Sequence, residues 1–157
     1  MAAASAGRKS HAFCCALFLL YLASLIYLLF LSQMREVTYN NINLTPFKTI
    51  RMLFEYYFVY HQFSFWYWFS NFFGNMFLLA PFGFLLPIVL KRRMHPAAIL
   101  CSSGLFSLLI EACQFAFQVG EADVDDLILN VVGALIGYAI FRFCLFIHTR
   151  KVKRRIS

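Results

Sequence analysis

Long apolar runs alternate with short polar segments along this chain of 157 residues. Four runs are long enough to cross about 30 Å of hydrocarbon as helices, which takes about 20 residues each. They cover residues 11–32, 70–90, 97–118 and 127–147. The first run is longer than the apolar region of a signal peptide, and no A-x-A-like cleavage site follows it. The pattern therefore predicts an all-α, polytopic membrane protein with four transmembrane helices in a single membrane domain, residues 1–157.

The segment between the first two runs, residues 33–69, is polar at its start and aromatic at its end. The stretch "YNNINLTPF" predicts a turn followed by a helix with Pro46 at its first position. Between Leu53 and Phe69, eleven of seventeen residues are aromatic. Because Tyr and Trp favour the headgroup level of a bilayer, we expect a helix or re-entrant segment lying in the outer interface.

The composition indicates that lipid, rather than water, surrounds most of the chain. Hydrophobic residues make up 62% of it and charged residues only 13%, whereas soluble domains are nearer half apolar. A chain of this length could not bury so much apolar surface in its own interior. The five cysteines all lie in apolar segments without metal-ligand spacing, so we interpret them as packing residues and expect no metal site and no cofactor.

The net charge of +7 is distributed in clusters that flank the apolar runs, which is typical of membrane topology rather than of nucleic-acid binding. One face would carry ten basic residues: Arg8, Lys9, Lys91, Arg92, Arg93, Arg150, Lys151, Lys153, Arg154 and Arg155. The other face would carry Arg35, Lys48 and Arg51, with Arg142 near the inner end of the fourth run. The positive-inside rule predicts that both termini are cytoplasmic and that residues 149–157 form a basic cytoplasmic tail.

Polar residues inside the predicted spans fall on single helical faces. In the third span this face consists of Ser103, Ser107, Glu111, Gln114 and Gln118, at spacings of three or four. Glu111 would lie roughly 10 Å below the outer surface, and an ionised carboxylate at the centre of a bilayer costs at least ~2.5 kcal/mol. It must therefore face water or other helices, or be protonated, and we expect it to have a functional role.

The second and fourth spans carry comparable groups. Asp126, Asn130, Gly133 and Gly137 share a face of the fourth span, and Asn71, Gly74 and Asn75 lie near the outer end of the second. We expect Gly74, Gly133 and Gly137 to be helix-packing positions, the last two as a GxxxG motif. That motif could face the chain's own bundle or a second copy of the chain, so the sequence leaves open whether the protein forms a homo-oligomer. The asparagines could equally be interhelical hydrogen-bond partners.

Four of the seven acidic residues lie within "EADVDD", residues 121–126, directly before the fourth run. Asp125 and Asp126 could cap the start of that helix, where carboxylates accept free N–H groups. The same carboxylates could form the rim of a polar recess that opens outward. Both interpretations remain open from the sequence.

Four ordered motifs carry a resemblance to a known family. They are "NLTPFKTI" (43–50), "NFFGNMFLLAPFGFLLP" (71–87), "IEACQ" (110–114) and "DVDDLILNVVGALIGY" (123–138). Together they resemble the VanZ-like family of small bacterial integral membrane proteins, over about residues 40–140. The matching positions are Asn43, Pro46, Phe47, Asn71, Gly74, Asn75, Pro81, Gly83, Glu111, Gln114, Asp123, Asp125, Asp126, Asn130 and Gly133. Many members of that family carry a basic residue just before the aspartates, where this chain has Gly120 and Glu121.

The resemblance implies a multi-pass protein of the bacterial cell membrane and an association with resistance to the lipoglycopeptide teicoplanin. We expect an outward-facing polar pocket that binds an amphiphile: a membrane lipid, a lipid-linked cell-wall component or the lipid-tailed antibiotic itself. The residues expected to line it are Asn71, Asn75, Glu111, Gln114, Asp123, Asp125, Asp126 and Asn130. A cationic or amine-bearing headgroup would suit the acidic rim better than a bare phosphate.

Two other functions stay open. The first is an intramembrane enzyme acting on a lipid-linked envelope substrate, with Glu111 as general base and Asp125 or Asp126 as its partner. No nucleophile with an adjacent base and no HExxH motif supports it, so a non-enzymatic role is favoured. The second is a small transporter or flippase that uses Glu111 as a proton relay.

Overall fold

The computed structural model describes residues 2–31, 42–119 and 121–156, so Arg35 and Gly120 of the sequence argument lie outside the described residues. The long helices are α1 (Ala2–Ile26), α3 (Phe65–Val89), α4 (Pro96–Phe117) and α5 (Val124–Ile156). The short elements are α2 (Lys48–Phe54), the π-helical turns Tyr27–Leu31 and Glu55–Val59, and the two-residue strands β1 (Ile42–Asn43) and β2 (Ala122–Asp123).

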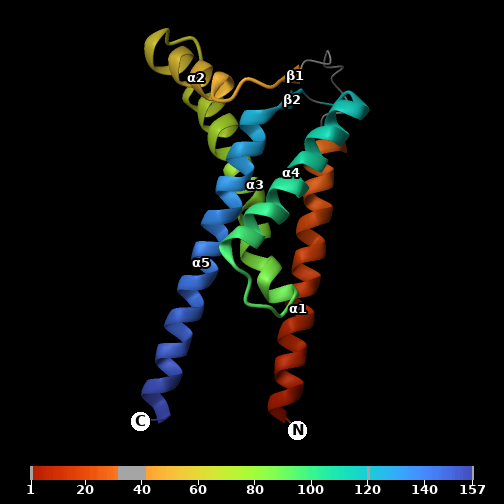
Figure 1. Ribbon diagram of the computed structural model, residues 1–157, viewed down its shortest axis with the longest axis vertical. Helices are drawn as coiled ribbons and strands as arrows, with labels where there is room; N and C mark the ends of the chain where they lie inside the picture. The colour runs from red at the N-terminus through yellow and green to blue at the C-terminus, as the bar shows by residue number, and fades with distance from the viewer. Residues whose placement is uncertain (1, 32–41, 120, 157) are drawn as a thin grey trace.

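The predicted all-α, polytopic architecture is confirmed. Among the described residues, four helical segments are long and apolar enough to cross a membrane: Arg8–Leu29, Phe65–Val89, Pro96–Phe117 and Val124–Lys151. The first residues of α1 and the last of α5 lie at the same end of the bundle, and α2, β1 and β2 lie at the other (Figure 1). We call these the terminal end and the α2 end. Which of them faces the cytoplasm stays a prediction from the charge distribution.

The aromatic segment forms a hairpin between α2 with the turn Glu55–Val59 and the start of α3. Its location in the outer interface stays a prediction. α3 begins at Phe65 rather than at residue 70, with the Ser64 side chain accepting a hydrogen bond from the N–H of Tyr67. The turn Glu55–Val59 extends α2, and rings from both arms pack together, including Tyr57 stacked on Trp68 with centroids 5.2 Å apart. The predicted helix start at Pro46 was also two residues early, because α2 begins at Lys48.

Glycines bring α3 and α5 into direct backbone contact. A Cβ on Gly133 would lie 1.9 Å from the carbonyl oxygen of Met76, and one on Gly137 would lie 1.9 Å from that of Ala80. In this structure the GxxxG face is therefore occupied by the chain's own α3. Gly74 does not fit the predicted packing role, because a Cβ there would meet nothing within 4 Å.

The bundle buries several polar side chains beside an apolar core and exposes many large apolar side chains at its surface. Ser103, Ser107 and Asn130 are fully or almost fully buried, whereas Phe13 and Leu105 are 69% and 71% exposed. Helix α1 lies mostly on the outside, joined to α3 by the Tyr21 hydroxyl, which donates to the carbonyl of Leu78 at 2.7 Å. Large exposed apolar side chains are stable where lipid surrounds the helices, which agrees with the predicted spans.

Candidate functional site

A short parallel ladder joins two distant segments at the α2 end. Ile42 pairs with Ala122 and Asn43 with Asp123. The Asn43 side-chain amide donates to Asp123 Oδ1 and to Thr49 Oγ1, each at 3.0 Å, and the Thr49 hydroxyl donates to Asp123 Oδ2 at 2.5 Å. The ladder and this side-chain network hold the segment before α2 against the start of α5.

Asp125 is a structural residue that caps α2 from the neighbouring helix. Its side chain is fully buried. One oxygen accepts the N–H of Phe47 at 2.5 Å, and the other accepts those of Thr49 and Ile50 at 2.8 and 3.1 Å. These are free N–H groups of a helix N-terminus, where a carboxylate is favourable. The three bonds also hold Phe47 in the left-handed backbone region, with φ at 63°.

Capping of the fourth span comes from a different aspartate than the sequence suggested. Asp123, the residue before α5, accepts the N–H of Asp125 with its Oδ1 at 2.9 Å. Asp125 and Asp126 lie in the first turn of the helix, but their side chains point to other partners. Two of the four clustered acids, Asp123 and Asp125, are thus occupied in fastening α2 to α5.

A polar cleft of about 290 Å³ opens beside these contacts, between α2, α3, α4 and the start of α5. Its polar lining consists of Thr49, Tyr67, Asn71, Gln114, Glu121, Asp123, Asp125 and Asp126, and its apolar lining of Ile50, Met52, Leu53 and Leu129. The cleft is slightly smaller than the usual 300–1,000 Å³ of small-molecule pockets. It therefore has room for a headgroup but not for an entire amphiphile.

Asp126 of this cluster and Glu111 of α4 each leave one oxygen available. Asp126 lines the cleft, and its Oδ1 accepts the side-chain amide of Asn75 at 2.5 Å. Glu111 is 6% exposed, and its Oε2 accepts the backbone N–H of Asp123 at 3.1 Å. No hydrogen bond within the described part of the chain reaches Oδ2 of Asp126 or Oε1 of Glu111. The two groups are close enough for their charges to repel one another.

The predicted pocket residues thus separate into three groups. Those that line the cleft are Asn71, Gln114, Asp123, Asp125 and Asp126. Asn75 and Glu111 lie next to it, bonded to Asp126 and to the Asp123 backbone. Asn130 lies apart from the lining and donates to the Ser107 hydroxyl at 3.0 Å, while its own Oδ1 is buried without a partner among the described residues. It is an interhelical contact between α4 and α5.

The charges of the cleft favour a cation or a hydrogen-bond donor over an anion. Two carboxylates with free oxygens in a partly buried site repel each other, and either a bound cation or a proton relieves that repulsion. In the described residues, no cluster of three or more His, Cys, Asp or Glu has the arrangement to hold a metal ion. The ion pair on α2 lies outside the cleft lining: Arg51 Nε is 2.7 Å from Glu55 Oε1, and this hydrogen bond raises the pKa of Arg51.

Thr49 is the main residue of this site that the sequence did not single out. It lies inside "NLTPFKTI", but only the network with Asn43 and Asp123 shows why a hydroxyl is needed there. Residues 49 and 123 are 74 positions apart, so no local spacing could reveal the contact. Paired substitutions at these positions in related sequences would be the signal to look for.

Comparison with known proteins supports the resemblance seen in the sequence. A family model described as VanZ/LLP1 matches residues 18–146. No curated protein matched the chain, and no solved structure matched it. The matched range includes the ladder, the α2 cap, the cleft and most of α5.

Proposed function

The chain belongs to the VanZ/LLP1 family, and from that premise we propose that its cleft binds the cationic or amine-bearing headgroup of an amphiphile. The observation that carries the proposal is the pair Glu111 and Asp126, two carboxylates that each have an oxygen without a donor among the described residues. An ammonium group placed between them would gain charge-assisted hydrogen bonds. Asn71 and Gln114 add neutral polar groups to the same walls.

The surroundings of the cleft suit an amphiphile rather than a free amine. The cleft holds only a headgroup, so the acyl chains would lie outside it. The aromatic hairpin beside it exposes large apolar side chains, among them Phe58 at 54% and Trp66 at 73%. Such rings commonly lie at the headgroup level of a bilayer, where acyl chains begin. The binding partner is therefore a membrane lipid, a lipid-linked wall precursor or a lipid-tailed antibiotic.

The proposed physiological consequence is a lower susceptibility to teicoplanin-type lipoglycopeptides in the bacterial envelope. In a susceptible strain that expresses the protein, Glu111→Gln and Asp126→Asn should each abolish any protection. Glu55→Gln is the matched control, because it removes one negative charge at the α2 end without lining the cleft. Unchanged susceptibility in both cleft variants, at normal expression, would count against this role.

A direct binding measurement tests the cleft independently of any antibiotic. Lipids that co-purify with the wild type in mild detergent should include an amine-bearing species that is depleted in Asp126→Asn and retained in Glu55→Gln. Reaction products of labelled lipid precursors, lost in Asp126→Asn, would instead favour the intramembrane enzyme. Lipid movement in proteoliposomes that depends on a pH gradient would favour the flippase.

A further inference from the structure

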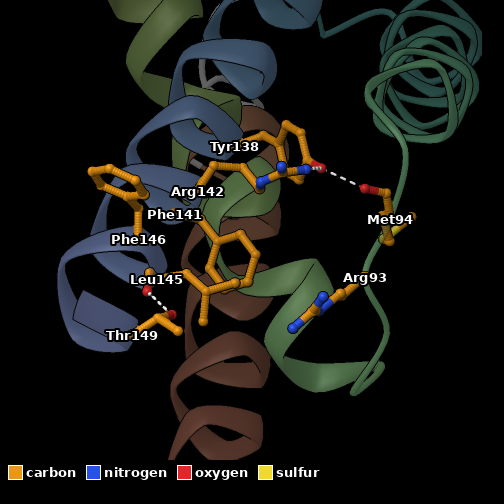
Figure 2. A pocket seen from close by; sticks show the side chains of 8 residues that line it. All are labelled: Arg93, Met94, Tyr138, Phe141, Arg142, Leu145, Phe146 and Thr149. Carbon is orange, nitrogen blue, oxygen red and sulfur yellow. Dashed lines mark hydrogen bonds between the residues drawn. The ribbon is translucent and has the colours of Figure 1, made fainter. Parts of the chain in front are cut away.

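A second cavity, of about 230 Å³, lies toward the terminal end of the bundle, away from the carboxylate cleft. Its walls come from the loop after α3, with Arg93 and Met94, and from α5, with Tyr138, Phe141 and Arg142 (Figure 2). The cavity is about eight times the ~30 Å³ that a water molecule occupies in the liquid. It is therefore large enough for a polar headgroup rather than for a single ion.

Arg142 is positioned along the wall of this cavity by its neighbours. Its Nη1 donates to the Tyr138 hydroxyl at 3.0 Å, and its guanidinium carbon lies 5.8 Å from the centroid of the same ring. The Tyr138 hydroxyl in turn donates to the carbonyl of Met94 (Figure 2). Tyr138 is only 4% exposed, so this chain of contacts fixes α5 against the loop and leaves the rest of the guanidinium fork available.

No carboxylate among the described residues balances the two arginines. The described acidic residues are Glu55, Glu111, Glu121, Asp123, Asp125 and Asp126, all at the α2 end. Arg93 and Arg142 form no ion pair with any residue that the structure describes. Farther along α5, Arg150 lies over the ring of Phe146, 4.2 Å from its centroid, and adds further positive charge. Within the described part of the chain, the cavity therefore has no counter-charge.

The position of Arg142 along α5 determines which part of a lipid it could meet. It lies eighteen residues after Val124, the first residue of α5, which places it roughly 27 Å along the helix. The hydrocarbon core of a bilayer is about 30 Å thick. With Val124 at one boundary of that core, the backbone of Arg142 lies about 3 Å short of the other boundary, and its long side chain can extend to the headgroups there. Phe141, Leu145 and Phe146 provide an apolar wall along the same cavity for the adjoining acyl chain.

We propose that this cavity binds the phosphodiester of an anionic phospholipid, in the leaflet at the terminal end of the bundle. Arg93 and Arg142 would hold the phosphate oxygens, a task for which the planar guanidinium is suited. A net negative lipid is required, because the ammonium of a zwitterionic headgroup would find no carboxylate among the described residues that line the cavity. Basic pockets between transmembrane helices are a recognised means of retaining anionic lipids. This site is separate from the cleft, and the proposal does not depend on the function assigned to the cleft.

The test is a titration of the purified full-length protein in mild detergent, with unfolding temperature as the readout. The probes are phosphatidylglycerol, phosphatidylcholine and inorganic phosphate. Phosphatidylglycerol should stabilise the wild type at the lowest concentration. Equal effects of both lipids would overturn the proposal, and so would inorganic phosphate acting as well as phosphatidylglycerol, which would indicate a free-phosphate site.

Matched variants separate the cavity from general surface charge. Arg93→Gln with Arg142→Gln should lower the apparent affinity for phosphatidylglycerol at least about tenfold. Lys91→Gln with Arg92→Gln removes the same charge from exposed residues outside the cavity lining. This pair should change the apparent affinity for phosphatidylglycerol less than about threefold. Equal losses in the two pairs would overturn the proposal.

A conservative variant keeps the test valid if the double variant does not fold. Arg142→Lys retains the charge but loses the planar fork, and it should weaken phosphatidylglycerol binding about threefold or more. An unchanged affinity in Arg142→Lys would also overturn the proposal.

Discussion

Replacement of Asp125 by asparagine should destabilise the protein much more than the same replacement of its neighbour Asp126. The side chain of Asp125 accepts three backbone N–H groups from the start of α2, those of Phe47, Thr49 and Ile50. Asparagine has nearly the same shape but only one acceptor oxygen, so its NH₂ group would face at least one of these N–H donors. That donor would remain buried without a partner.

The structure sets the size of the effect. A hydrogen bond to a charged group contributes about 1.5–3 kcal/mol, and a buried donor without a partner costs about 1–3 kcal/mol. With at least one bond lost and the others no longer charge-assisted, Asp125→Asn should lower the free energy of unfolding by about 3 kcal/mol. For a chain of this size this corresponds to a fall in unfolding temperature on the order of 10 °C.

Asp126→Asn is the internal control, because the same chemical change at the next residue meets a different environment. The oxygen of the new side chain can still accept from Asn75, and the repulsion with Glu111 disappears. Its stability should therefore stay within about 1 kcal/mol of the wild type. The two variants differ from the wild type by the same charge and nearly the same mass, so any difference between them reports position alone.

Two measurements in mild detergent check the prediction. The first is thermal unfolding, where only Asp125→Asn should shift strongly. The second is limited trypsin digestion, because loss of the cap should release α2 and expose cleavage sites at Lys48 and Arg51. Equal stability of the two variants would refute the reasoning, and so would protection of Lys48 and Arg51 in Asp125→Asn.

Three further predictions follow from other contacts. Gly133→Ala should lower the free energy of unfolding by about 1–3 kcal/mol or more, because its Cβ would lie 1.9 Å from a carbonyl oxygen of α3. Gly74→Ala, with open space around it, should raise the free energy of unfolding by about 0.5–1 kcal/mol. Equal effects of the two variants in thermal unfolding would contradict the packing. Asn43→Ala removes donors to two partners and should cost about 1–3 kcal/mol in the same assay, unless the ladder alone holds the segment. In intact cells, a membrane-impermeant maleimide should label Lys48→Cys but not Lys91→Cys, measured against the wild-type background; the reverse pattern would invert the predicted orientation.

The same polar residues illustrate how far sequence patterns reach. Helical spacing correctly grouped Ser103, Ser107 and Glu111 on one face of α4, and all three are buried in the bundle. It could not distinguish Asp125 from Asp126, because both are aspartates in the first turn of α5. One points to the N-terminus of α2 and the other to Asn75, and that difference depends on which helix lies on each side.

The acidic segment 121–126 does not form a simple rim of four free charges. Asp123 and Asp125 are occupied by donors from residues 43–50. Glu111 and Asp126, from two different helices, each keep one oxygen that no donor among the described residues reaches. The sequence showed where negative charge gathers, whereas the structure shows which part of it a ligand could use.

By itself, the sequence determined the number of long helices, their approximate limits and the family, because hydrophobic run length, helical periodicity and ordered motifs are local properties of the chain. It did not determine the hairpin of the aromatic segment, the ladder between residues 42–43 and 122–123, or the basic cavity at Arg93 and Arg142. Each of these depends on contacts between residues far apart in the chain, such as the 80 positions between Asn43 and Asp123. Periodicity places a side chain on a face of its own helix, but only the packing of the helices decides what that face meets.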